Sequence, residues 1–114
     1  MVNCLFCRMV SGEVPADVVA DDERTLAFRD INPQAPVHVL VIPKRHHPDV
    51  AALAGGDPEA LAAIHATAGR VAAQEGIAET GWRLVFNTGA GAGQSVFHVH
   101  GHVLGGRPFS WPPG

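Results

Sequence analysis

The amino-acid sequence predicts a single α+β domain built on a mostly antiparallel β-sheet. The chain has 114 residues, the usual size of one domain, and 46% of them are hydrophobic, which is enough for one core. Short segments rich in β-branched residues outnumber helical patterns, and only one helical pattern is long. Several strands with few helices are typical of an α+β fold. We therefore expect one domain over residues 1–114, with residues 105–114 as an irregular C-terminal arm rich in Gly and Pro.

The first half of the chain predicts one short helix followed by three strands. The opening CLFCRMVSGEVP is expected to be helical because its apolar residues fall near helical spacing, and a Gly followed by a Pro ends it. Residues 17–21 and 25–28 resemble two short strands around an acidic turn. Residues 37–42 are nearly all β-branched or apolar, so we expect a well-buried strand that ends at Pro43.

The second half predicts one long helix and two more strands. The helix spans residues 58–75, with Asp57 as its N-cap and Gly76 at its end. Its apolar stripe consists of Leu61, Ile64, His65, Ala68, Val71 and Ala72. Residues 82–87 and 95–104 complete the sheet and are separated by the glycine-rich loop TGAGAG.

Composition and charge exclude several classes of protein. Eight Lys and Arg residues against eleven Asp and Glu residues give a net charge of −3, and no basic block is present, so we expect no nucleic-acid partner. No apolar run approaches the roughly 18 residues needed to cross a bilayer, and the N-terminus lacks the pattern of a signal peptide. We therefore expect a cytoplasmic protein without a membrane partner.

Three of the seven histidines, His98, His100 and His102, alternate along the last predicted strand. Alternate residues of a strand share a face and lie about 6.6 Å apart, so the three rings should project together. Val99 and Val103 would face the core. Buried core histidines are one explanation, but each ring would then need a hydrogen-bond partner. A metal site is the stronger competitor because neutral imidazole is a common metal ligand, although no acidic residue lies within ten residues on either side.

The glycine-rich loop before these histidines suits an anion. Gly89, Gly91 and Gly93 allow backbone N–H groups to approach a phosphate closely, and Gln94 and Ser95 add side-chain donors. A Gly-x-Gly-x-Gly pattern by itself often serves only as a turn. Its position directly before the histidines favours the phosphate-binding interpretation.

Longer motifs extend this interpretation. FHVHGHVL resembles the signature of the histidine-triad superfamily, and AFRDINPQAPVHVLVIPKRH, NTGAGAGQSVFHVH and the terminal WPPG resemble its Hint branch, the histidine-triad nucleotide-binding proteins. The resemblance covers the chain from Cys4 to Gly114. It implies a five-stranded antiparallel sheet with one long and one short helix, in a protein that forms dimers. Gly101 departs from the signature, which has a hydrophobic residue there, and this could weaken packing or admit a bulky neighbour.

The resemblance implies a purine nucleoside phosphoramidase in which His100 attacks the α-phosphorus and forms a nucleotidyl-histidine. A neutral imidazole can do this if an acceptor such as a backbone carbonyl holds its other nitrogen. The same resemblance implies that His102 holds the phosphate oxygens, that His98 supports the site, and that His38 faces His100 from the neighbouring strand. Ser95 would contact the leaving group or a phosphate oxygen. No metal or cofactor is then required at phosphorus.

The nucleotide pocket is also assigned by resemblance. Asp30 would accept hydrogen bonds from the ribose hydroxyls, Ile31 would offer an apolar face to a purine, and Asn87 would lie nearby. Taken alone, Asp-Ile-Asn-Pro would be an ordinary turn. The full nucleotide-binding set that we expect is Asp30, Ile31, Asn87, Gly93, Gln94, Ser95, His100 and His102.

Two cysteines, Cys4 and Cys7, lie three residues apart on one side of the first helix, which suits two thiolates on one zinc ion. Some bacterial proteins of the resembled family complete such a structural zinc site with residues that correspond to His46 and His98. His47 could replace His46. Buried unliganded cysteines and a redox pair are the alternatives.

Three other functions are compatible with these residues. The first is a dinucleoside polyphosphate hydrolase or phosphorylase, the second a nucleotide-binding regulatory module, and the third a zinc-dependent hydrolase. The WPPG ending favours the phosphoramidase over the first, and the intact triad with Ser95 argues against the second.

The surface of the long helix and the arm predict a homodimer. The helix has a small-residue face that would let a second helix approach closely, formed by Ala62, Ala66, Gly69 and Ala73. In the arm, Phe109 and Trp111 are large apolar groups among Gly and Pro residues. The resemblance implies that this arm reaches towards the active site of the partner subunit, where Trp111 would border the leaving group. His65 is expected to have a structural role.

Overall fold

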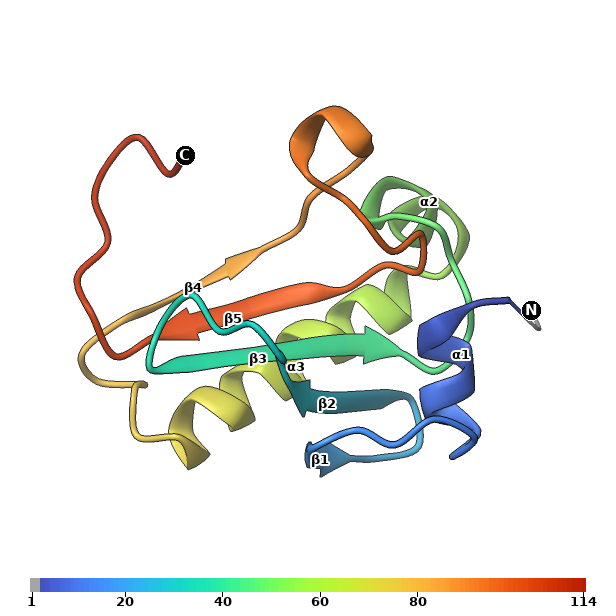
Figure 1. Ribbon diagram of the computed structural model, residues 1–114, viewed down its shortest axis with the longest axis horizontal. Coiled ribbons are helices and arrows are strands. Elements are labelled where there is room, and N and C mark those ends of the chain that lie inside the picture. Colours follow the sequence, from blue (N-terminus) through green and yellow to red (C-terminus); the bar gives the residue numbers. More distant parts are fainter. Residues whose placement is uncertain (1–2) are drawn as a thin grey trace.

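The computed structural model describes residues 3–114 and contains one five-stranded antiparallel sheet (Figure 1). The strands are β1 (Val18–Asp21), β2 (Thr25–Arg29), β3 (Val37–Pro43), β4 (Trp82–Val85) and β5 (Gly101–Gly105). Their order in the sheet is β1-β2-β3-β5-β4, and every pairing is antiparallel. The α+β class and the five-stranded antiparallel sheet are therefore confirmed.

Capping residues fix the ends of the helices. The helices are α1 (Leu5–Val10), α2 (Val50–Gly56), α3 (Pro58–Gln74) and the 3₁₀ turn η1 (Ala90–Ala92). Helix α3 begins as predicted, because the Asp57 side chain accepts a hydrogen bond from the Ala60 N–H and Pro58 occupies the first turn. Helix α2 was not predicted. Only one of its residues, Leu53, is buried. A helix that buries so little shows no apolar periodicity in its sequence, so no pattern indicated it.

The two faces of the sheet are covered differently. Behind the sheet in Figure 1, α3 packs Ile64 and Val71 against Val39 and Val103 in the main core. In front of it, α1 places Phe6 in edge-on contact with Phe28. Strand β3 is buried along its whole length, as its sequence predicted. The front face is only partly covered, and this leaves space for a site.

The strand predicted over residues 95–104 is shorter in the structure. Pairing in β5 begins only at Gly101, which lies opposite Val41. The backbone before it follows another path, because the Val99 N–H donates to the carbonyl of His47 instead of a strand neighbour. His98 and His100 therefore lie in an irregular segment, and only His102 belongs to the strand.

His65 also lies elsewhere than predicted. It was placed on the apolar stripe of the long helix, but the structure leaves it exposed, with Nδ1 3.1 Å from the Leu61 carbonyl. The buried face of α3 instead includes Ala60 and Thr67, so it is centred on a different side of the helix from the one that carries His65. Within residues 3–114 no helix is long and apolar enough to cross a membrane.

Gly101 is expected to be essential for stability rather than for chemistry. A Cβ atom there would lie 2.8 Å from Leu84 Cδ1 and 3.1 Å from Phe86, so the glycine does admit bulky neighbours. We expect Gly101→Ala to lower the free energy of unfolding by about 1–3 kcal/mol, the usual cost of overpacking, as measured by urea denaturation. Gly91→Ala is the matched control, because a Cβ at Gly91 meets nothing within 4 Å. Equal stabilities of the two variants would contradict this account.

Candidate active site

A cavity of about 440 Å³ opens on the front face of the sheet. Its wall is apolar, with Phe6 and Met9 from α1 and Phe28 from β2. Ser95, His100 and His102 lie in the same lining, together with Asp30 and Ile31. An apolar pocket in which a few polar groups converge is the usual form of a small-molecule site.

His100 has the hydrogen bonding of a nucleophile. Its Nδ1 lies 2.9 Å from the carbonyl oxygen of His98. Since a carbonyl only accepts, Nδ1 carries a proton, and the neutral form of the ring has its lone pair on Nε2. The ring is buried and packs edge-on against Phe6, with ring centres 5.1 Å apart. The imidazole is thereby held in the orientation and tautomer that attack on phosphorus needs.

His102 and His38 form a second pair of rings. His38 Nε2 lies 2.9 Å from His102 Nδ1, and the Asp30 carboxylate lies 3.5 Å from the same His38 nitrogen. Burial lowers the pKa of His102 to about 4, with smaller contributions from the neighbouring His100 and His38. Burial also lowers the pKa of His38, against the opposing effect of Asp30. Both rings are therefore neutral at pH 7.

A loop between β2 and β3 carries the expected nucleoside contacts. Asp30 lines the cavity, its Oδ1 accepts a hydrogen bond from the Asn32 N–H at 2.8 Å, and its Oδ2 lies 3.5 Å from His38 Nε2. Ile31 is fully exposed, with a relative accessibility of 101%. An apolar side chain presented in this way at the edge of a cavity can cover an apolar ligand.

The glycine-rich loop uses much of its own hydrogen-bonding capacity. Gly89 and Gly93 adopt φ values of 86° and 92°, which favour glycine, and the N–H groups of Ala92, Gly93 and Gln94 all donate within the loop. The Gln94 amide accepts from the Gly89 N–H and donates to the carbonyls of Pro48 and Val96. These hydrogen bonds therefore support the loop itself.

Cys4, Cys7, His46 and His98 converge on one point, with one donor atom from each within 4.8 Å of the others. The sulfur of Cys7 lies 3.6 Å from His46 Nδ1 and 3.5 Å from His98 Nδ1, and the two nitrogens are 3.2 Å apart. A tetrahedral zinc ion, with bonds of about 2.0 Å to nitrogen and 2.3 Å to sulfur, separates its ligands by roughly 3.3–3.8 Å. These residues therefore fit zinc.

His98 links this cluster to the cavity. Its Nε2 donates to the carbonyl of Pro43 at 2.8 Å, which leaves the Nδ1 lone pair facing the cysteines. Its own carbonyl holds His100. His47 points elsewhere and lines a different hollow, so His46 is the residue that joins the cluster.

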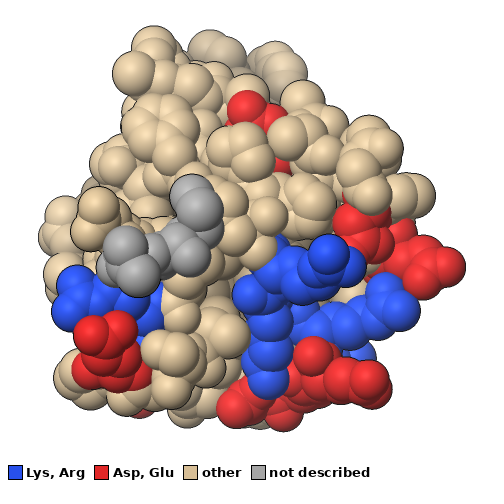
Figure 2. Space-filling view, turned by 90° about the vertical axis from the view of Figure 1, so that its right-hand side faces the viewer, with Lys and Arg blue, Asp and Glu red and all other residues tan. Residues whose placement is uncertain are grey.

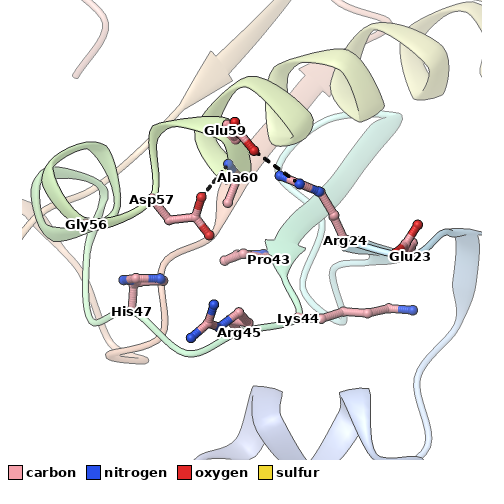
Figure 3. A pocket seen from close by; sticks show the side chains of 10 residues that line it. All are labelled: Glu23, Arg24, Pro43, Lys44, Arg45, His47, Gly56, Asp57, Glu59 and Ala60. Atoms are coloured by element: carbon pink, nitrogen blue, oxygen red, sulfur yellow. Dashed lines mark hydrogen bonds and ion pairs between the residues drawn. The ribbon is translucent and has the colours of Figure 1, made fainter.

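That other hollow is highly charged (Figure 3). Arg24 reaches across it to Glu59 at 3.2 Å, and Asp57 is occupied as the N-cap of α3. Figure 2 shows Lys and Arg side chains lying among Asp and Glu side chains on one face of the molecule. Lys44, which lines the hollow, pairs with Asp21 at 2.6 Å. Because Arg24, Glu59 and Asp57 are already engaged in this way, this hollow is a weaker candidate than the cavity lined by the histidines.

A family model described as the HIT domain matches residues 11–109. The chain belongs to the HIT family. An uncharacterized HIT-like protein of Synechocystis is 51% identical over 112 residues, which cover 98% of this chain and 97% of that protein. A purine nucleoside phosphoramidase of Escherichia coli K12 is 45% identical over 104 residues, which cover 91% and 87%.

The solved structures agree with this HIT assignment. A HIT family hydrolase from Legionella pneumophila has a TM-score of 0.94 and 53% identity, covering 98% of this chain and 100% of that one. The fold and the enzyme class predicted from the motifs are therefore confirmed, and this protein is a HIT-family hydrolase.

In this HIT chain most of the expected site residues come together, but not all. His38 contacts His102 rather than His100, because the register places His38 opposite Leu104 and His102 opposite Leu40. The cavity is lined by Asp30, Ile31, Ser95, His100 and His102, whereas Asn87, Gly93 and Gln94 lie outside its lining.

Sequence reasoning missed the apolar wall of the HIT site. The sequence assigned Met9 only to a helix and Phe28 only to a strand, and it gave Phe6 no role. Alternation along β2 was the available signal, because Phe28 points to the face opposite α3.

Proposed function

We propose that this hydrolase cleaves the P–N bond of purine nucleoside 5′-phosphoramidates through a nucleotidyl-histidine on His100. The observation that carries the proposal is the fixed ring of His100, whose Nδ1 is held by the His98 carbonyl while the ring lines an apolar cavity. The relative named purine nucleoside phosphoramidase supports the choice of substrate.

The reaction requires two displacements at phosphorus. In the first, the Nε2 lone pair of His100 attacks the α-phosphorus, the P–N bond to the amine breaks, and the amine leaves with a proton taken from solvent, to which the attacking water of the second displacement returns one. In the second, water attacks phosphorus and the bond to His100 breaks, which releases a nucleoside monophosphate. His102 would donate to a phosphate oxygen, and Ser95 would contact the leaving group or an oxygen. No metal or cofactor is required at phosphorus in this scheme.

An assay against two substrate classes tests the proposal directly. Pure protein would be given adenosine 5′-phosphoramidate and a diadenosine polyphosphate side by side. Faster release of the monophosphate from the phosphoramidate is the expected result. A higher kcat/KM on the polyphosphate would instead assign the chain to the dinucleoside polyphosphate hydrolases.

Asp30 is expected to recognise the ribose. A carboxylate accepts hydrogen bonds from hydroxyls, so Asp30→Asn should raise KM by about 10-fold or more, the value of one charged hydrogen bond. A 2′,3′-dideoxy substrate supplies the sharper comparison: the wild type should discriminate against it, and Asp30→Asn should discriminate much less. The exposed Glu79→Gln is the control. Undiminished discrimination in Asp30→Asn would rule out this role.

We propose that Cys4, Cys7, His46 and His98 bind one structural zinc ion. The ligand separations described above support this set. Reduced thiols of this kind persist in the reducing cytoplasm, which is the compartment that we propose for the protein.

We propose a homodimer formed through the small-residue face of α3. Ala62, Ala66 and Ala73 are exposed on it. The C-terminal arm supports the proposal. The guanidinium carbons of Arg107 and Arg83 lie 4.3 and 5.1 Å from the ring centre of Phe109 and cover it. Trp111, in contrast, is 84% exposed and could pack on a partner. Light scattering at micromolar concentration should give twice the mass of the chain, and Ala66→Arg should give a monomer. A wild-type monomer would refute the dimer.

A further inference from the structure

A chain of hydrogen bonds runs from the backbone to the active-site rings. The Gln34 N–H donates to His38 Nδ1 at 3.0 Å, and His38 Nε2 lies 2.9 Å from His102 Nδ1. Because a peptide N–H only donates, His38 Nδ1 must be the unprotonated nitrogen. A neutral imidazole carries one N–H, so His38 holds its proton on Nε2 and donates it to His102 Nδ1. His102 must then carry its own proton on Nε2.

We propose that the peptide N–H of Gln34, acting through His38, fixes the tautomer of His102 so that His102 Nε2–H is the donor to the transferred phosphoryl group. This inference rests on the proposed function, because it assigns a role within that reaction. His38 is a positioning residue in this scheme, and Gln34 contributes its backbone rather than its side chain.

The neighbouring ring shows why the tautomer matters. His100 and His102 have ring centres 5.0 Å apart, yet His100 carries its proton on Nδ1, where it donates to the His98 carbonyl. The nucleophile needs a lone pair on Nε2, whereas a phosphate oxygen needs a donor. The His98 carbonyl therefore fixes the tautomer of His100, with the proton on Nδ1. The Gln34 N–H, through His38, fixes the opposite tautomer of His102, with the proton on Nε2.

Because the two rings are buried, the tautomer of His102 decides how it interacts with a phosphate. Both His38 and His102 are neutral at pH 7, so neither ring offers a permanent positive charge to the phosphate. If His102 had the other tautomer, its Nε2 lone pair would face an anionic oxygen, and a stabilising contact would become a repulsive one.

The surrounding groups reinforce the relay. The Asp30 carboxylate, 3.5 Å from His38 Nε2, favours a proton on that nitrogen. Asp30, His38 and His102 are close enough together to suggest a cation site. Both nitrogens of His38 are already engaged in hydrogen bonds, however, so the geometry favours a relay. Arg107 Nε donates to the Gln34 carbonyl at 3.0 Å and thereby anchors the loop that carries Gln34.

Nuclear magnetic resonance tests the tautomers without any substrate. In protein labelled with ¹⁵N-histidine at pH 7.5, long-range ¹H–¹⁵N correlation should find Nε2–H on His38 and His102 and Nδ1–H on His100. A proton on Nδ1 of His102 would overturn the proposal. Since no turnover is measured, this result does not depend on whether the enzyme cleaves phosphoramidates.

Removal of the single N–H tests its function. The 2-hydroxy acid analogue of glutamine, incorporated at position 34, replaces the N–H by an ester oxygen and keeps the side chain. We expect kcat on the phosphoramidate to fall about 10- to 100-fold, the value of one charged hydrogen bond, with the His102 tautomer shifted and monophosphate affinity within threefold. Gln34→Ala keeps the N–H and should change neither tautomer nor kcat. An unchanged kcat in the ester variant would refute the relay. If the protein showed the expected tautomers but did not cleave phosphoramidates, only the proposed function would be refuted.

Discussion

His100→Ala is expected to lower turnover of a nucleoside phosphoramidate by roughly 10⁴-fold or more, the scale on which enzymes lose rate with their nucleophile. Affinity for the nucleoside monophosphate should change by less than about tenfold, because binding relies mainly on the apolar wall and on Asp30. The measurements are steady-state kinetics and calorimetric titration with the monophosphate. A quenched reaction of the wild type should also yield protein whose mass is increased by one nucleotidyl group.

His65→Ala is the matched control for this loss. It removes an imidazole that is exposed on α3 and does not line the cavity, so its turnover should equal that of the wild type. Thermal unfolding of His100→Ala would establish that the variant is folded. If a folded His100→Ala protein kept turnover within tenfold of the wild type, another residue would have to be the nucleophile.

Removal of zinc is expected to lower the melting temperature by about 10–20 °C, because a ligand present at roughly 1,000 times its Kd contributes about 4 kcal/mol. The ligand cluster joins α1 to the segment after β3 and to the segment before β5, so its loss frees three parts of the chain. Elemental analysis should find about one zinc per chain, and a chelator should reproduce the thermal shift.

Activity should fall less than stability when zinc is removed. His98 keeps its hydrogen bond to Pro43 without metal, so its carbonyl can still hold His100. His46→Ala should lose the metal, whereas His47→Ala, one residue further on, should retain it. If the metal-free wild-type protein had an unchanged melting temperature, the proposed zinc site would be refuted.

Local signals determined a large part of this structure. Asp57 and Pro58 fixed the start of α3, because a cap and a preset φ act within one turn. The buried character of β3 followed from its β-branched composition. The spacing of Cys4 and Cys7 and the His98 carbonyl two residues before His100 are equally local, so the sequence alone could place a thiol pair and an oriented nucleophile.

Contacts between distant segments decided the rest. The partner of His38 depends on the register of β3 against β5, and motif spacing does not encode a register. The choice of His46 over His47, and the apolar wall contributed by α1 and β2, depend on where those segments pack against the sheet.

The segment 95–100 illustrates the physical difference most clearly. Its alternating histidines have the period of a strand, but a strand also needs neighbours that accept its hydrogen bonds. Val99 donates to His47, and the His98 ring donates to Pro43 at the end of β3. The sequence by itself therefore indicated the side chains that we propose for the chemistry. Apart from the nearby His98 carbonyl that holds His100, only the tertiary structure decided their hydrogen-bond partners, because His38 and Pro43 come from segments distant in the chain.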